Sequence, residues 1–376
     1  LKLRNKYGLE GKADIQFLSA IDTIAYSIKI RKMTEEDLKL LAPKIAQFAA
    51  KMEEIRPGLS EPVFSALRNN PEIMADQMKL YSNLIDYFDG DPHRGKFFES
   101  LAKQGNALSK ENIMTITKAY RYFGILHVAR FQEKKGDFSL LNEMIRNKEE
   151  VKYNQNRELA VMIMPREGGG LITFDTFEMG NFYKVAKFMS KHFKLLAYSA
   201  PSRKAIAPIL ADAATVSGKK TSVLFLCGHG SPTRLNLGYN MYKSQKGAYI
   251  KGLNIQEGVD EQTWNYGKYD VKKYISRYQG DLDFETGDTR IFPKIKKKMT
   301  GRRLIISYAC KTADKSLGEK NFVRTLAKKT SCRVVGPTEN TQGCTLHFEG
   351  KTLMVNFFDE KNDVTYDTKY PKLDIE

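Results

Sequence analysis

Apolar residues follow two different patterns along the chain, and the pattern changes near residue 150. Before that point they recur every three or four positions, the spacing of amphipathic helices. Thr34 and Ser60 stand where helix N-caps are expected. We therefore predict an all-α N-terminal domain over residues 1–150, with helices that include Ala13–Ile30, Thr34–Ile55, Pro71–Phe88 and Lys110–Phe131.

After residue 150, short apolar runs alternate with segments of helical spacing. Expected helices are Asn181–Phe193, Arg203–Val216 and Ser316–Lys329. This alternation predicts an α/β domain over residues 151–376, with a predominantly parallel sheet and helices on both faces. The expected strands are Leu159–Met164, Leu195–Tyr198, the run beginning at Ser222, the run beginning at Arg303, Arg333–Val335 and Leu353–Phe358.

Two of these strands end in reactive residues. Gly228-His229-Gly230 follows the first, and Cys310 follows the second, 81 residues after His229. Because the carboxyl ends of parallel strands meet at one edge of a sheet, we expect His229 and Cys310 to face one crevice. An imidazole beside a thiol favours the thiolate and carries a proton to a leaving amine. The pattern predicts a catalytic His/Cys dyad.

Glycines flank the predicted catalytic histidine. Gly228 allows a sharp turn off the strand, and Gly230 leaves its backbone N–H open to a substrate. We expect the N–H groups of Gly230 and Cys310 to form an oxyanion hole.

The order of hydrophobic strand, His-Gly, long spacer, hydrophobic strand, small residue and Cys resembles the caspase-like superfamily of cysteine proteases. That superfamily includes caspases, legumain, gingipains, clostripain, separase and self-cleaving toxin protease domains. The resemblance covers roughly Leu159 to Phe358. It implies a three-layer αβα domain with a six-stranded sheet, His229 and Cys310 as the catalytic pair, and cleavage of protein substrates. No cofactor is expected.

Two short segments bear on cleavage specificity. Lys311-Thr312 follows Cys310 where animal caspases have Arg-Gly, so aspartate specificity does not carry over. In relatives the substrate pocket uses groups after the first strand, where this chain has Arg166 and Glu167. Arg166 is the candidate substrate-binding residue. A structural ion pair is the alternative role for either charge.

The same motifs allow other interpretations. Cys227-x-His229 could begin a zinc site, but no second Cys/His pair with ligand spacing follows. The acidic run Asp281–Asp288 lacks the glycine and the final glutamate of an EF-hand loop. We therefore predict no metal. The alternative function is a catalytically silent caspase-like adaptor that acts through the helical domain and a basic surface.

The cysteine count and the lengths of the apolar runs bear on the cellular compartment. Four cysteines in 376 residues do not form a disulfide framework, so we expect a reducing compartment, the cytoplasm. No apolar run is long enough to span a bilayer.

The net charge of +17 favours acidic partners, such as an anionic activator, an acidic protein or a membrane surface. Nucleic acid is disfavoured, because aromatic binding motifs are missing. We expect the long insertion Gly238–Thr300 and a basic cluster to control access to Cys310. The basic cluster comprises Lys294, Lys296, Lys297, Lys298, Arg302 and Arg303. The alternative interpretation of this cluster is a solvated loop.

Overall fold

The computed structural model describes residues 35–55, 94–104, 109–125, 128–165, 179–200, 205–236, 282–283, 291–358, 364–365 and 367–368. The chain divides into two compact units. The first comprises residues 1–117, 126–128 and 134–136, and the second comprises residues 118–125, 129–133 and 137–376.

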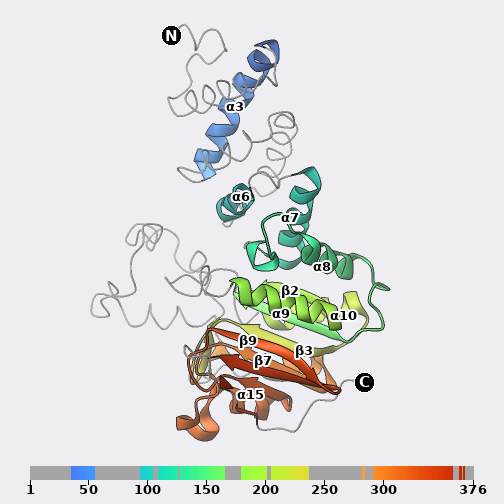
Figure 1. Ribbon diagram of the computed structural model, residues 1–376, viewed down its shortest axis with the longest axis vertical. Coiled ribbons are helices and arrows are strands. Elements are labelled where there is room, and N and C mark those ends of the chain that lie inside the picture. The colour runs from blue at the N-terminus through green and yellow to red at the C-terminus, as the bar shows by residue number, and fades with distance from the viewer. Residues whose placement is uncertain are drawn as a thin grey trace, which may run out of the picture. The chain divides into compact units, whose positions relative to one another are not determined.

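The described part of the first unit is helical. It holds α3 (Glu35–Ile55), α6 (Arg94–Ala102) and the first half of α7 (Lys110–Phe123), as Figure 1 shows. The expected helix Lys110–Phe131 stops at Phe123 because Gly124 adopts a left-handed backbone with φ of 68°. A short 3-10 helix, η3 (Val128–Phe131), follows. Expected helices at 13–30 and 71–88 lie outside the described residues.

A mostly parallel six-stranded sheet forms the centre of the second unit. Its order is β12-β8-β7-β3-β1-β2; the last five are mutually parallel and β12 is antiparallel to β8. Every residue of β1, β2 and β3 is buried, which explains their continuous apolar sequences. The strands are β1 (Leu159–Pro165), β2 (Lys194–Ala200), β3 (Thr221–Cys227), β7 (Met299–Tyr308), β8 (Arg333–Gly336) and β12 (Asp367–Thr368).

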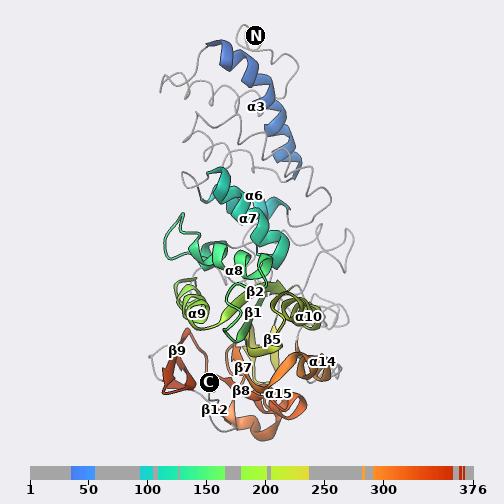
Figure 2. The ribbon, with the colours of Figure 1, turned by 90° about the vertical axis from the view of Figure 1, so that its right-hand side faces the viewer.

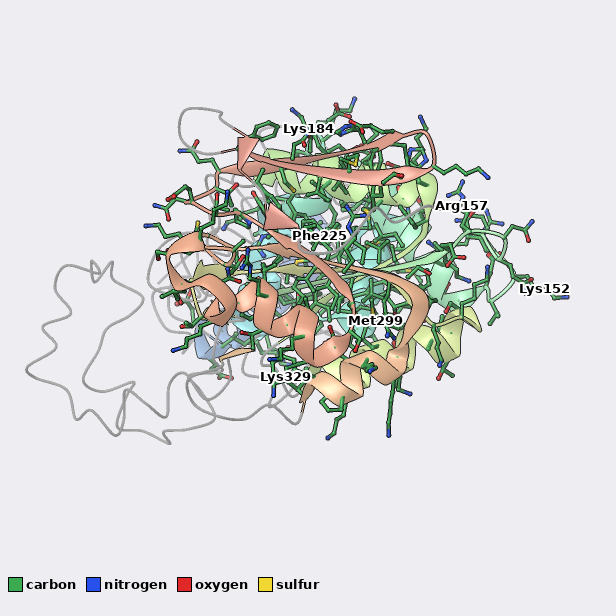
Figure 3. All side chains as sticks on the ribbon, turned by 90° about the horizontal axis from the view of Figure 1, so that it is seen from below. Lys152, Arg157, Lys184, Phe225, Met299 and Lys329 are labelled. Carbon is green, nitrogen blue, oxygen red and sulfur yellow. The ribbon has the colours of Figure 1, made fainter. Side chains whose placement is uncertain are left out.

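Both faces of this sheet are covered, so the mixed α/β prediction is confirmed. Helices α10 (Ile206–Ser217), α14 (Ile291–Lys298) and α15 (Phe322–Thr330) lie on one face (Figure 2). Helix α9 (Met179–His192) and a β-hairpin cover the other (Figure 2). Phe225 of β3 lies at the centre of the packed side chains (Figure 3).

The hairpin differs from the sequence expectation. The strand expected at Leu353–Phe358 forms as β10 (Thr352–Phe358), but it pairs with β9 (Gly343–Glu349) and β11 (Val364–Thr365) in a separate antiparallel sheet. Gly350, with φ of 59°, turns the chain between β9 and β10. Phe348 of β9 then packs against aromatic side chains of α9 and its end, which fixes the hairpin on that face.

The expected helix Ser316–Lys329 is also divided. A 3-10 helix, η8 (Lys315–Lys320), precedes α15, and the buried Asn321 caps α15 by accepting a hydrogen bond from the N–H of Arg324 at 2.9 Å. Asn321 also donates to the carbonyl of Asp314 at 3.0 Å. The side chain of one asparagine therefore caps α15 and ties its start to the residue that precedes η8.

Helix α8 (Ser139–Glu149) packs beside β2, so residue 150, where the sequence analysis places the domain boundary, lies within the second unit. Buried Asn147 donates to the carbonyl of Leu195 at 3.1 Å. Lys148 pairs with Asp212 of α10 at 2.5 Å, and the Tyr198 hydroxyl donates to the same carboxylate at 2.8 Å. These bonds join α8, α10 and β2.

Within the part of the chain that the structure describes, no helix is both long and apolar enough to cross a membrane.

Candidate active site

The strands that precede His229 and Cys310 are direct neighbours in the sheet. Cys227, the last residue of β3, lies opposite Tyr308, the last residue of β7, in parallel register. The N–H of Gly228 donates to the carbonyl of Tyr308 at 3.2 Å. Both strands therefore end at the same edge, and the segments that leave them start side by side.

Gly230 brings these two segments into backbone contact. A Cβ at this position would lie 2.4 Å from the carbonyl oxygen of Cys310 and 2.8 Å from both the carbonyl carbon and the Cβ of Ala309. Only glycine allows so close an approach. The residue after His229 therefore lies directly against the residue expected as nucleophile. The structure describes the backbone of His229, and its side chain lies outside the described atoms.

The chain reverses sharply after Cys310. Lys311 adopts a left-handed backbone with φ of 56°, and its N–H donates to the carbonyl of Glu339 at 2.9 Å. The buried hydroxyl of Thr312 donates back to the carbonyl of Ala309 at 2.9 Å. These bonds hold Cys310 at the point of a tight turn, half-buried at the end of a buried strand.

The start of α15 supports both segments of the site. The N–H of Phe322 donates to the carbonyl of Pro232, three residues after His229, at 2.7 Å. The N–H of Val323 donates to the carbonyl of Thr312, two residues after Cys310, at 2.9 Å. The N-terminal amide groups of one helix thus fix the loop from β3 relative to the turn from β7.

The sulfur of Cys310 lies against the backbone of Thr341. The N–H of Thr341 donates to Cys310 Sγ at 3.5 Å, and the thiol donates to the carbonyl of Thr341 at 3.7 Å. The buried Thr341 hydroxyl lies 2.8 Å from the carbonyls of both Gly343 and Phe358, where β9 begins and β10 ends. The N–H donor favours the anionic thiolate, whereas the carbonyl that accepts from the S–H group favours the neutral thiol.

Sequence reasoning missed Thr341. It lies 31 residues after Cys310 and reaches the sulfur only because the β9–β10 hairpin folds back over the carboxyl edge of the sheet. Neither its residue type nor its spacing carries a catalytic signal.

Arg166, the candidate substrate-binding residue, lies outside the described residues. In sequence, Arg166 directly follows β1. In the sheet, β1 lies between β2 and β3, and ligands of open α/β sheets bind at the carboxyl end of a strand in this position. A second cation is described near this strand end. Buried Arg130 of η3 donates from Nη1 to Met164 Sδ, one residue before the end of β1, at 3.8 Å.

The lysines of the basic cluster precede the amino end of β7, and Cys310 follows its carboxyl end. Lys294, Lys296, Lys297 and Lys298 belong to α14 rather than to a loop, and Met299, which begins β7, pairs with Thr221, which begins β3. Met299 and Tyr308, the two ends of β7, lie opposite Thr221 and Cys227 of β3, so six strand steps, about 20 Å, separate the end of α14 from the start of the turn at Cys310. Closeness in sequence therefore does not bring this cluster to Cys310.

The cysteines differ in exposure. None of the four forms a disulfide; Cys227, Cys332 and Cys344 are buried, whereas Cys310 is half-buried. Burial raises the pKa of Cys332, which disfavours its reactive thiolate form. Among the residues that the structure describes, no group of three His, Cys, Asp or Glu side chains is placed to hold a metal ion.

Comparisons of this chain with protein-family models, with curated proteins and with solved structures give no match.

Proposed function

We propose that the second unit is a caspase-like cysteine endopeptidase in which Cys310 is the nucleophile and His229 the general base and acid. The observation that carries this proposal is the contact of the Gly230 backbone with Ala309 and Cys310. It places two motifs that are remote in sequence at the carboxyl edge of two adjacent parallel strands. A thiol and an imidazole that leave these strand ends suit acyl transfer through a covalent intermediate.

The order of strands supports the same fold family. In chain order, His229 follows the third strand of the main sheet, β3, and Cys310 follows the fourth, β7. That is the arrangement implied by the caspase-like resemblance.

The proposed reaction proceeds in two steps. The Cys310 thiolate attacks the scissile carbonyl carbon and forms a C–S bond, while the N–H groups of Gly230 and Cys310 stabilise the oxyanion. His229 donates its proton to the amine nitrogen as the C–N bond breaks. Water, deprotonated by His229, then hydrolyses the thioester, releases the carboxylate product and restores the thiol. The N–H of Thr341 stabilises the thiolate before attack.

This function implies a protein substrate and a reducing environment that keeps Cys310 as a thiol. Arg166 is proposed to contact the substrate, since in sequence it directly follows β1. The N-terminal helical region is proposed to restrain or dock the protease unit.

The test replaces one thiol at a time. Cys310→Ala should abolish cleavage of a peptide library, read by mass spectrometry, and should leave the circular dichroism spectrum unchanged because the side chain is small and half-buried. Cys332→Ala is the matched control, since Cys332 is buried directly before β8, and this variant should retain activity. Equal cleavage by Cys310→Ala and the unmodified chain would exclude the protease. A folded chain that cleaves no peptide at all would favour the silent adaptor.

A further inference from the structure

Two neighbouring helices build a strongly basic surface away from Cys310. Residues 291–303 contain six Lys or Arg residues and residues 322–335 contain four, and neither segment contains Asp or Glu. Helices α14 and α15 pack against each other on the same face of the sheet (Figure 2). The basic face is defined here by Lys294, Lys296, Lys297, Arg303, Lys328 and Lys329.

Hydrogen bonds show that the two helices bring their cations together. Lys296 of α14 donates to the hydroxyl of Ser331, directly after α15, at 3.0 Å. Arg303 of β7 donates to the carbonyl of Ser331 at 3.3 Å and to the carbonyl of Lys296 at 3.4 Å. The five lysines of the face are exposed to solvent. Cations from three elements therefore gather around the C-terminal end of α15.

Helix capping does not account for this number of charges. Cations in the last turn of a helix offset the negative end of its dipole, and the effect is local to that turn. Here the last turns of α14 and α15 carry three and two lysines. Lys294 and Arg303 lie outside those turns. The surplus positive charges repel one another unless an anionic partner covers them.

The chemistry of the face points to a diffuse anionic surface. The exposed large apolar side chains among the described residues are Met114, Val151 and Leu317, and none belongs to this face. It therefore offers nothing for stacking bases or for insertion into a hydrocarbon layer. Lysine ammonium groups are compact, hydrated point charges, which suit an array of lipid headgroups better than one fixed site.

We propose that the basic face binds the surface of an anionic lipid bilayer and tethers the protein there. From Arg303 to the end of β7 at Tyr308 the extended strand rises by five residue steps, about 17 Å, which exceeds the Debye length of about 8 Å at physiological salt. The tether therefore acts by location and leaves the chemistry of Cys310 unchanged. This proposal stands whether or not Cys310 is catalytic.

The test measures sedimentation of the full chain with vesicles. Vesicles of phosphatidylcholine with about 30 % phosphatidylserine should bind the protein at about 0.1 M salt, and pure phosphatidylcholine vesicles should not. Replacing Lys294, Lys297, Lys328 and Lys329 by Ser should lower the partition coefficient by more than about 100-fold. Lys296 is kept because it bonds Ser331.

A matched variant controls for net charge. Lys152, Lys184, Lys191 and Lys351 are exposed lysines outside the basic face, and Lys152, Lys184 and Lys329 lie well apart in Figure 3. Changing these four to Ser removes the same charge and should lower vesicle binding by less than about 10-fold. Equal losses of vesicle binding in the two variants would show that binding depends only on net charge, and would overturn the proposal. So would failure of the unmodified chain to bind, or tighter binding of the face to duplex DNA at the same salt.

Discussion

Gly230→Ala tests whether the contact between the two motifs organises the site. The added Cβ would lie 2.4 Å from the carbonyl oxygen of Cys310 and 2.8 Å from two atoms of Ala309. Favourable contacts between such atoms lie at about 3.5 Å, so the overlap amounts to about 1 Å. Two of the three atoms belong to the backbone of Ala309 and Cys310, directly after β7, and backbone cannot turn aside as a long side chain can.

The magnitude follows from that overlap. Overpacking in a tight region costs about 1–3 kcal/mol of unfolding free energy. The chain relieves the clash by moving residues 228–231 away from Cys310, and a displacement of about 1 Å lowers catalysis by about 100-fold. We therefore expect Gly230→Ala to lose both stability and most of kcat/KM.

The assay combines urea denaturation with peptide cleavage, and Gly301→Ala is the matched control. Gly301 lies on β7, and a Cβ there would meet no atom within 4 Å. This control should keep full activity and change stability by less than about 1 kcal/mol. If Gly230→Ala keeps both the stability and the activity of the unmodified chain, the close contact does not organise the site.

Two further predictions concern single hydroxyl groups. Thr341→Val removes the hydroxyl that fixes the loop beside Cys310, so the pH profile of Cys310 alkylation by iodoacetamide should shift to higher pH. Thr341→Ser should restore the original pH profile. An unchanged pH profile in Thr341→Val would exclude this role of the hydroxyl. Tyr198→Phe should cost about 1 kcal/mol at neutral pH, because it removes the bond to Asp212. Burial, together with the charge of Asp212, raises the pKa of Tyr198, so the unmodified chain should lose stability above about pH 10, where the unfolded tyrosine ionises. Alkaline thermal melts in which Tyr198→Phe falls just as steeply would contradict that explanation.

The parallel sheet could be predicted because buried strands leave a direct trace in sequence. β1, β2 and β3 are apolar on both faces, and helical spacing between them requires crossovers. The sequence also carries a signal for the end of α7, because Gly124 directly follows Phe123 and glycine favours the left-handed backbone that ends helices.

Contacts made by folding back could not be predicted from sequence. Thr341 reaches Cys310 through the hairpin, and the pairing of β10 with β9 rather than with the main sheet depends on the packing of Phe348 on α9. The basic cluster shows the opposite case. Residues close in sequence to Cys310 lie far from it because an extended strand separates them.

The central claim is that His229 activates Cys310, and selective labelling tests it most directly. A peptidyl acyloxymethyl ketone should label the unmodified chain at Cys310, located by mass spectrometry of its tryptic peptides, and leave Cys227, Cys332 and Cys344 unlabelled because they are buried. His229→Ala should remove this labelling while thermal unfolding stays unchanged. Labelling of Cys310 at an equal rate in His229→Ala would contradict the dyad.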